Sequence, residues 1–240
     1  LTPKCDEYKN TPAGCWATAI SQIFAYYKFP LTISYVSSGK RSNCDMTWGA
    51  ILQYTNADND RLRKIYQKQV SRLLYGVGVN IGMDYSCAAS GASADDAMKY
   101  MNNVGYSGCS SHGYDFSIVR EQLKNKRPLL MNGKSQKTKK SLWVHMYSGG
   151  HVWIVDGYSS TVLEDYSYVS NIDNGQTSTK LVKTSYENPL IHINWGWKGI
   201  DNGYFASGCF HVLQAKSYDD KIGVESYNFQ YKQNLFPIWK

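Results

Sequence analysis

Three residues of this chain have side chains that could act together in nucleophilic catalysis: Cys15, His151 and Asn194. A cysteine thiolate attacks carbonyl carbons, a neighbouring histidine accepts the thiol proton and later returns it, and an asparagine oxygen can hold the imidazole ring without adding a charge. The order Cys, His, Asn is typical of sites where the cysteine opens a helix and its partners come from a later sheet. The predicted chemistry is acyl transfer to Cys15, and we expect Cys15 and His151 to rest as a thiolate–imidazolium pair.

Cys15 lies near the start of a predicted helix. Apolar residues recur at helical spacing over residues 12–27, so the thiol falls in the first turn, where the helix dipole and free backbone N–H groups favour the thiolate. The small residues Ala13, Gly14 and Ala17 leave room for the backbone of a substrate. The alternative is that Cys15 is a buried structural cysteine on an apolar helix face.

His151 is the histidine best placed to act as a base. It follows two glycines and opens the apolar run 152–155, so it can face a cleft while its strand stays rigid. The alternative is a histidine satisfied within the core. His192 alternates with two isoleucines and shares a strand face with Asn194. The other three histidines are predicted to be structural or exposed: His112, His145 and His211.

Asn194 is followed by Trp195, whose ring could shield a hydrogen bond between the asparagine and the imidazole from water. A buried hydrogen bond of this kind would fix the orientation of the ring. The alternative for the Trp-Gly-Trp segment that begins at Trp195 is simple core packing at a turn.

The elements that must position these residues fall into two groups along the chain. Periodicity and capping signals predict helices over residues 12–27, 48–56, 60–77, 93–104 and 117–125. Short apolar runs between turn residues predict strands over residues 128–132, 151–158, 190–195, 203–206 and 224–231, with the polar segment 159–188 as a long hairpin extension. Helices followed by strands indicate an α+β protein of two packed halves, with a boundary near residue 115.

The six cysteines predict neither a metal site nor a complete set of disulfides. They lack Cys-x-x-Cys and zinc-finger spacing, so we expect no structural metal. If Cys15 is catalytic, five remain, so at most two disulfides and a spare thiol can form. Cys87 and Cys109 are one candidate pair.

The chain has 240 residues and a formal net charge of +7. The densest basic stretch, residues 134–140, is short and has no interleaved aromatic residues, so we expect a solvated loop there rather than a nucleic-acid site. No signal peptide begins the sequence, and no apolar run reaches the roughly 20 residues needed to span a bilayer.

The sequence around the three candidate residues resembles the streptopain family of papain-like cysteine proteases. The resemblance covers about residues 12–207. Its most specific motifs are Gly-Cys-Trp-Ala-Thr-Ala at Cys15, Gly-Gly-His-Val-Trp-Ile-Val-Asp-Gly at His151, and His-Ile-Asn-Trp-Gly-Trp at Asn194, in family order. Together these motifs are far more specific than any one of them.

The resemblance implies a secreted bacterial cysteine endopeptidase made as a zymogen. It implies Cys15 as nucleophile, His151 as base and Asn194 as orienting residue. Further residues are implied beside them or lining the substrate groove: Trp195, Gly150, Ser90 and Gly91. It also implies a papain-like fold, with a helical lobe (residues 1–115), a β-sheet lobe (residues 116–240) and the active-site cleft between them. The implied partners are a protein or peptide substrate, often with an apolar side chain two residues before the cut, and an inhibitory N-terminal propeptide. We expect no cofactor, no nucleic acid, no membrane span and a monomer.

The sequence departs from the family pattern at three places. The family has an oxyanion-hole Gln upstream of a segment like Leu1-Thr2-Pro3, and Gln22 cannot replace it because it lies two turns into the helix. Lys198 changes the turn after the Trp-Gly-Trp segment, and the segments 134–148 and 159–188 are longer than expected. The alternatives are therefore an amidase or transpeptidase with the same residues, and a catalytically impaired binding module.

Overall fold

The computed structural model describes residues 2–6, 9–56, 59–140, 145–173, 176–212 and 227–240. The helices are α1 (Cys15–Tyr27), α2 (Trp48–Leu52), the 3-10 helix η1 (Tyr54–Asn56), α3 (Asp60–Asn80), α4 (Ala94–Val104) and α5 (Phe116–Lys124). The strands are β1 (Thr32–Ser37), β2 (Lys40–Asp45), β3 (Ser107–Gly108), β4 (His112–Gly113), β5 (Leu129–Lys139), β6 (His145–Asp173), β7 (Gln176–Asn194), β8 (Gly203–Ala206), β9 (His211–Val212), β10 (Tyr227–Asn228), β11 (Tyr231–Phe236) and β12 (Ile238–Trp239).

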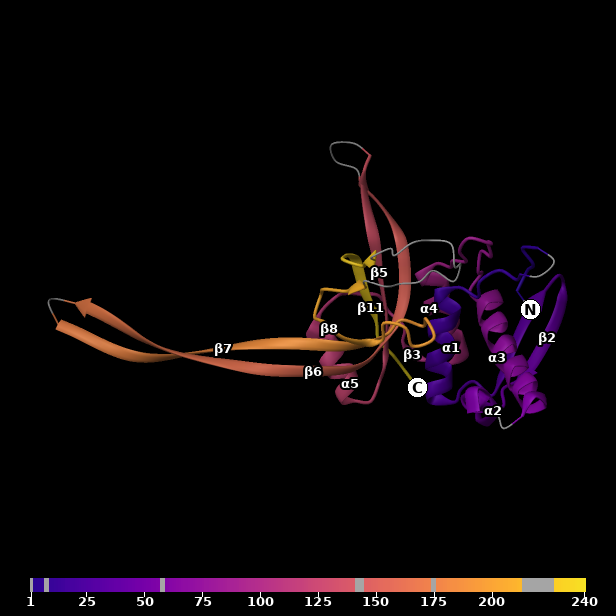
Figure 1. Ribbon diagram of the computed structural model, residues 1–240, viewed down its shortest axis with the longest axis horizontal. Coiled ribbons are helices and arrows are strands. Elements are labelled where there is room, and N and C mark those ends of the chain that lie inside the picture. The colour runs from indigo at the N-terminus through magenta and orange to yellow at the C-terminus, as the bar shows by residue number, and fades with distance from the viewer. Residues whose placement is uncertain (1, 7–8, 57–58, 141–144, 174–175, 213–226) are drawn as a thin grey trace.

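The predicted α+β composition is confirmed, and most of the helices gather on one side of the molecule (Figure 1). The expected capping signals act as predicted: the side chain of Asn59 accepts a hydrogen bond at the start of α3, and that of Ser93 does so at the start of α4. The bounds differ in detail. The first helix begins at Cys15 rather than at residue 12, and the second ends at Leu52 with a separate 3-10 turn after it.

A six-stranded antiparallel sheet, in the order β4-β11-β5-β6-β7-β8, forms the other side of the molecule. Four of the five predicted strands lie within β5, β6, β7 and β8. The prediction over residues 224–231 is wrong within its described part, because a two-residue strand, β10, ends at Asn228 and β11 starts only at Tyr231. Residues 224–226 lie outside the described residues.

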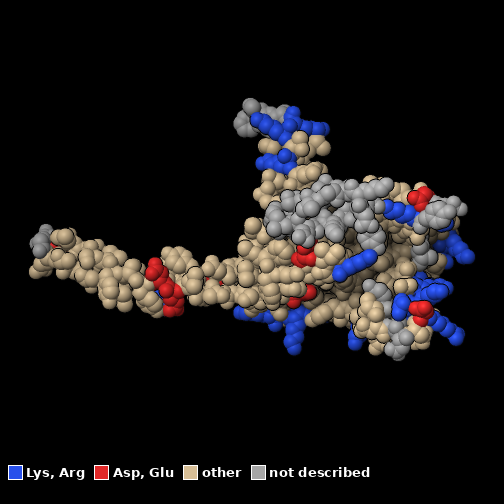
Figure 2. All heavy atoms as spheres, in the orientation of Figure 1, with Lys and Arg blue, Asp and Glu red and all other residues tan. Residues whose placement is uncertain are grey.

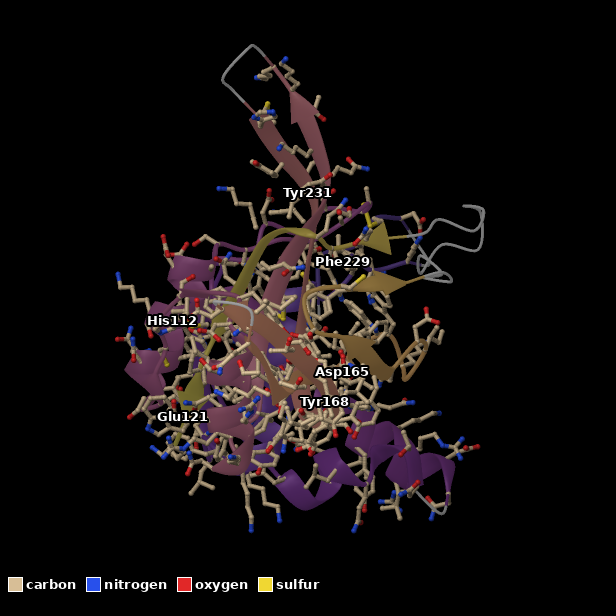
Figure 3. All side chains as sticks on the ribbon, turned by 90° about the vertical axis from the view of Figure 1, so that its left-hand side faces the viewer. His112, Glu121, Asp165, Tyr168, Phe229 and Tyr231 are labelled. Carbon is tan, nitrogen blue, oxygen red and sulfur yellow. A yellow bond between two sulfur atoms is a disulfide. The ribbon has the colours of Figure 1, made fainter. Side chains whose placement is uncertain are left out.

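Two long hairpins leave the sheet in different directions (Figure 1). The β6–β7 arm pairs continuously from Ser159↔Leu190 to Asp173↔Gln176, which confirms the predicted hairpin extension. In the view turned by 90°, Asp165 and Tyr168 lie on this arm, and the β5–β6 hairpin rises above Tyr231 (Figure 3). The prediction of a loop over residues 134–140 is wrong for residues 134–139, which continue β5 and pair with β6.

The β1–β2 hairpin was not among the predicted elements. Its strands pair in register from Thr32↔Asp45 to Ser37↔Lys40. In β1 the buried residues Ile33 and Tyr35 alternate with exposed ones, and this period of two is the signal that could have identified the strand.

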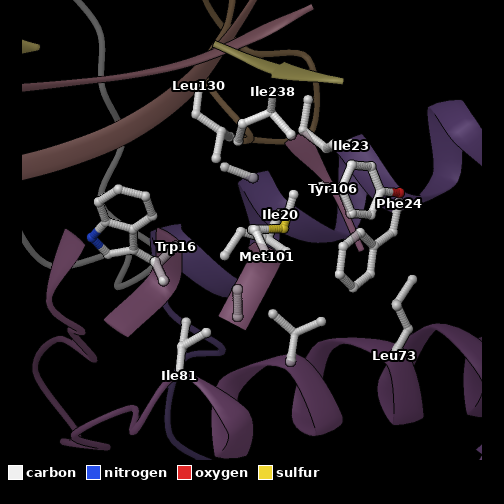
Figure 4. Close-up of a cluster of buried hydrophobic side chains, with 14 of the residues drawn as sticks. Trp16, Ile20, Ile23, Phe24, Leu73, Ile81, Met101, Tyr106, Leu130 and Ile238 are labelled. Atoms are coloured by element: carbon white, nitrogen blue, oxygen red, sulfur yellow. The ribbon is translucent and has the colours of Figure 1, made fainter. Parts of the chain in front are cut away.

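Two hydrophobic clusters hold the elements together. The first joins α1, α3 and α4 to one face of the sheet, through residues such as Trp16, Ile20 and Leu130 (Figure 4). The second lies on the other face of the sheet and includes Trp153 and Trp195. Because α1 packs directly on β5 and β6 in the first cluster, the start of α1 is held next to the strand that carries His151.

The predicted pairing of Cys87 with Cys109 is wrong. Cys87 forms a disulfide with Cys5, across a sequence separation of 82 residues. Cys109 is a free, buried cysteine in the first hydrophobic cluster, with its Sγ 3.7 Å from the carbonyl oxygen of Tyr106. Burial in an apolar cluster is a common fate of a free cysteine, and sequence spacing alone does not reveal it.

Candidate active site

Gly14 and Cys15 set the start of helix α1. Gly14 is the N-cap residue, with φ of 88°, a conformation that glycine adopts without a steric penalty. A Cβ atom at Gly14 would lie 2.6 Å from the sulfur of Met83 and 3.1 Å from the carbonyl oxygen of Ser90. Only glycine lets the chain pass this point closely and turn into the helix, and Cys15 therefore falls on the first helical residue as predicted.

The thiol of Cys15 faces backbone N–H groups from two elements. Burial raises its pKa, and the N–H groups of Val152, Trp16 and Cys15 itself act in the opposite direction. Two of these donors belong to the helix start and the third to β6, immediately after His151. Desolvation is the larger effect and favours the neutral thiol over the expected resting thiolate, although the surrounding donors would stabilise a negative charge.

The imidazole of His151 is oriented by a backbone carbonyl. Its Nε2 lies 2.8 Å from the carbonyl oxygen of Trp195. A carbonyl oxygen only accepts hydrogen bonds, so in the neutral ring Nε2 carries the proton and Nδ1 has the free lone pair. Nδ1 is thus the atom of His151 that can act as a base.

Aromatic rings enclose the same imidazole. The ring of Trp197 stacks on it with centroids 4.6 Å apart, and those of Trp153, Trp195 and Phe229 lie within 6.1 Å. This burial lowers the pKa of His151 to about 4, although the hydrogen bond to the Trp195 carbonyl opposes the shift. His151 is therefore neutral, and able to accept a proton, at any pH well above 4.

Asn194 contacts neighbours other than the histidine. Its Oδ1 accepts hydrogen bonds from the backbone N–H of Gly196 at 3.0 Å and from the Nε2 of Gln22 at 3.4 Å. The predicted orienting position beside His151 is instead held by the backbone carbonyl of Trp195. Asn194 shapes the turn that presents this carbonyl and links the turn to helix α1.

Further hydrogen bonds fix Trp195 itself. Its backbone N–H donates to Oδ1 of Asn202 at 3.0 Å, and its indole Nε1 donates to the carbonyl oxygen of Asp201 at 3.1 Å. Sequence reasoning gave no role to Asn202 or Gln22. Gln22 lies on α1 and Asn202 in the turn before β8, and the sequence gives no sign that they meet the segment of Trp195 in the folded chain. Together they make the Trp195 carbonyl a rigid acceptor for His151.

The predicted groove residues lie on two sides of the nucleophile. The carbonyl of Ser90 approaches Gly14, and Gly91 pairs with Asp84 through two backbone hydrogen bonds of 2.8 and 3.1 Å. Gly150 is exposed, immediately precedes His151 and pairs with Lys134 of β5. Lys134 is a further residue of this region that sequence reasoning assigned to a solvated loop.

The described part of the chain holds no group of three or more His, Cys, Asp or Glu side chains suited to a metal ion. The chemistry available at the site is that of a thiol, an imidazole with a free Nδ1 and backbone N–H donors, which is the chemistry of acyl transfer to sulfur.

A model of the Peptidase C10 family matches residues 1–205 of this sequence. The chain belongs to the Peptidase C10 family. This membership confirms the resemblance to the streptopain family drawn from the sequence motifs.

Relatives of known name agree with this membership. Streptopain of Streptococcus pyogenes is 22% identical over 241 residues, which covers 85% of this chain and 50% of that protein. The streptopain of serotype M1 matches over the same shares, so this Peptidase C10 chain spans about half the length of the curated relatives it matches.

Two solved structures share the fold. One is the active wild-type interpain A cysteine protease of Prevotella intermedia, with a TM-score of 0.59, 20% identity and coverage of 98% of this chain and 86% of that chain. The other is a prointerpain A fragment from the same organism, with a TM-score of 0.57, 18% identity and coverage of 99% and 65%. Among the residues that the structure describes, no helix is long and apolar enough to cross a membrane.

Proposed function

We propose that the chain is a cysteine endopeptidase in which Cys15 is the nucleophile and His151 the general base. The observation that carries this proposal is the placement of the Cys15 thiol at the start of α1, against the N–H group of Val152. His151 is the preceding residue of the same strand and keeps Nδ1 unprotonated. A thiol and a base are thus held on two rigid elements that pack on each other.

The proposed reaction begins when Nδ1 of His151 takes the thiol proton and the sulfur of Cys15 attacks the carbonyl carbon of a peptide bond. The new C–S bond forms as the carbonyl becomes an oxyanion, which the N–H group of Cys15 stabilises. His151 then gives its proton to the leaving amine as the C–N bond breaks. Water hydrolyses the resulting thioester, with His151 again as base, and restores the thiol.

We assign Trp195 and Asn194 to positioning rather than to the reaction itself. The Trp195 carbonyl holds the Nε2–H of His151, which stabilises the imidazolium formed after proton transfer. Asn194 and Asn202 fix the backbone around this carbonyl from opposite sides. In this assignment Asn194 acts on His151 indirectly, through the backbone of Trp195.

We propose the wider features of the family for this chain as well. These are two papain-like lobes that meet near residue 115, secretion, and an inhibitory propeptide in a zymogen. The likeness to a prointerpain A fragment supports the propeptide, because that relative is a pro-form. We also propose that the chain acts as a monomer on protein or peptide substrates, without a metal or an organic cofactor.

The test is cleavage of an unfolded protein under mildly reducing conditions by the wild-type protein and by its Cys15→Ala and Cys209→Ser variants. Cys209 is a free, exposed cysteine and serves as the matched control. We expect Cys15→Ala to lose cleavage completely and Cys209→Ser to keep it. Undiminished cleavage by Cys15→Ala would refute the assignment of the nucleophile, and silence of the wild-type protein would favour a binding module. Capture of the acyl group by an added amine in preference to water would favour a transpeptidase.

A further inference from the structure

Lys134 is a charged residue beside the site that the proposed reaction does not use. It lies on β5 and pairs with Gly150, the residue before His151. The Nζ, Cδ and Cε atoms of Lys134 lie 2.5, 3.1 and 3.2 Å from the point that a Cβ atom of Gly150 would occupy. The lysine side chain therefore lies across Gly150, in the space that any larger residue there would fill.

The strand register places Lys134 on the same side of the sheet as the nucleophile. Side chains alternate along a strand, so Lys134 and Gly150 share a face with Val152 and Leu130, which pack in the first hydrophobic cluster. Cys15 packs against that same cluster. The Lys134–Gly150 pair lies two residues, or about 7 Å, along the strands from the pair that contains Val152.

Lys134 is partly buried, and its ammonium forms none of the ion pairs found among the described residues. A cation that is partly removed from water without a carboxylate partner is costly unless an anion can approach it. Its charge also acts to lower the pKa of the Cys15 thiol, which agrees with its position near the nucleophile.

We propose that Lys134 is a specificity-determining residue that selects substrates with an acidic side chain within two residues of the residue whose carbonyl carbon is attacked. The inference deepens the proposed peptidase function and rests on it. An extended peptide rises about 3.3 Å per residue and presents alternate side chains to the same face. A side chain two residues from the reacting residue thus lies about 7 Å away, which is the spacing along the strands between Lys134 and Val152, the residue whose N–H group faces the Cys15 thiol.

The experiment compares kcat/KM for fluorogenic peptides that differ only by Glu or Gln at one position, from three residues before the scissile bond to two after it. For the wild-type protein we expect the Glu peptide to be cleaved about tenfold faster at one of these positions. Lys134→Met should bring this ratio close to one. Lys134→Glu should reverse the preference, so that a Lys peptide is cleaved faster than the Gln peptide.

Lys137→Met is the matched control, because Lys137 lies on the same strand but on its opposite face, over the ring of Tyr231. We expect it to keep the wild-type Glu/Gln ratio. A wild-type ratio of one at every position would overturn the inference while leaving the peptidase function intact. The inference is also wrong if Lys134→Met slows all peptides equally, shifts the pH dependence of Cys15 alkylation and leaves the ratio unchanged. A wild-type protein that cleaves none of the peptides would refute the peptidase function itself.

Discussion

Two features of the His151 environment shift the pKa of its imidazole in opposite directions. Stacked aromatic rings exclude water and lower its pKa to about 4, while the Trp195 carbonyl would stabilise the protonated ring. Burial likewise raises the pKa of the Cys15 thiol. Each charge alone is unfavourable in the substrate-free site. The two charges are best formed together, when the proton passes from the sulfur to the imidazole and each ion acts as the partner of the other.

The low pKa of His151 makes a prediction for the pH dependence of the reaction. A general base must be neutral to accept a proton, so kcat/KM should fall as the pH drops through the His151 pKa of the free protein, near pH 4 rather than near 6.5. The measurement is a pH profile of kcat/KM for a neutral peptide. Wild-type activity should therefore be nearly complete at pH 5.5.

Trp197→Leu tests the cause of this shift. Trp197 covers one face of the imidazole and is itself only partly buried, so its loss admits water to the ring. The acid limb of the variant should move up toward pH 6.5 because the protonated ring is better solvated. An acid limb already near pH 6.5 in the wild-type protein would contradict the burial argument.

For single residues, the sequence points to site side chains with distinctive chemistry but not to individual backbone groups. The sequence can nominate Cys15 and His151 for the proposed roles because thiol and imidazole side chains have distinctive chemistry. The acceptor for His151 could not be chosen, because every residue has a carbonyl and no sequence signal marks the one of Trp195. The sequence predicts a hydrogen bond from Asn194 to the His151 imidazole because Asn194 carries the side-chain acceptor of this motif. In the structure the Asn194 side chain accepts from the N–H group of Gly196 and shapes the turn.

Among the elements, the β6–β7 arm contributes least to the core. Its residues are exposed over nearly the whole length, including apolar ones such as Tyr168 and Ile172, each 76% exposed. A two-stranded ribbon that packs on nothing is only marginally stable in water. In the space-filling view the arm carries few charges, whereas Lys and Arg side chains gather on the β5–β6 hairpin (Figure 2).

Shortening the arm should leave the folded body intact. Leu163 and Tyr186 pair directly, so replacing residues 164–185 by Asn-Gly would close a tight hairpin between them and retain Glu187, which pairs with Arg120. We expect Tm to change by no more than about 2 °C and peptide cleavage to be retained, because no buried contact is lost.

Thermal unfolding, with Ile193→Ala as the positive control, checks this prediction. Ile193 is fully buried on β7, and its truncation should cost about 2–5 kcal/mol. If the shortened protein fails to fold or melts as early as Ile193→Ala, then the arm supports the body in a way that its exposure does not reveal.

The helices could be predicted from the sequence more accurately than the strands, for a physical reason. Helices α3 and α4 can be predicted because their signals, a capping residue and a continuous apolar face, lie within a few turns of the chain. Strand β5 continues through Lys134 to Lys139 because its partner lies in β6, a non-local pairing that leaves no pattern in a polar segment exposed on both faces. The arm was recognised only by its length and polarity.

For the whole molecule, the disulfide between Cys5 and Cys87 joins the N-terminal segment to the loop just before Ser90. That loop approaches Gly14, next to the nucleophile. A crosslink across 82 residues lowers the entropy of the unfolded chain, which stabilises the folded state by about 4.5 kcal/mol in the chain-entropy model. The proposed function therefore requires Cys15 to be reduced, whereas the disulfide requires Cys5 and Cys87 to be oxidised.

Strong reductant should accordingly lower the Tm of the wild-type protein by about 10 °C, as expected for a loss of several kcal/mol in a chain of this size. The double variant Cys5→Ser with Cys87→Ser should melt at that lower temperature with or without reductant, whereas Cys209→Ser should behave like the wild type. If reductant lowers the Tm of the double variant by the same amount, the effect arises elsewhere and the crosslink is not what stabilises the protein. If Tm responds as expected, peptide cleavage should be greatest at intermediate reductant, where Cys15 is free and the Cys5–Cys87 bond still holds the loop beside it.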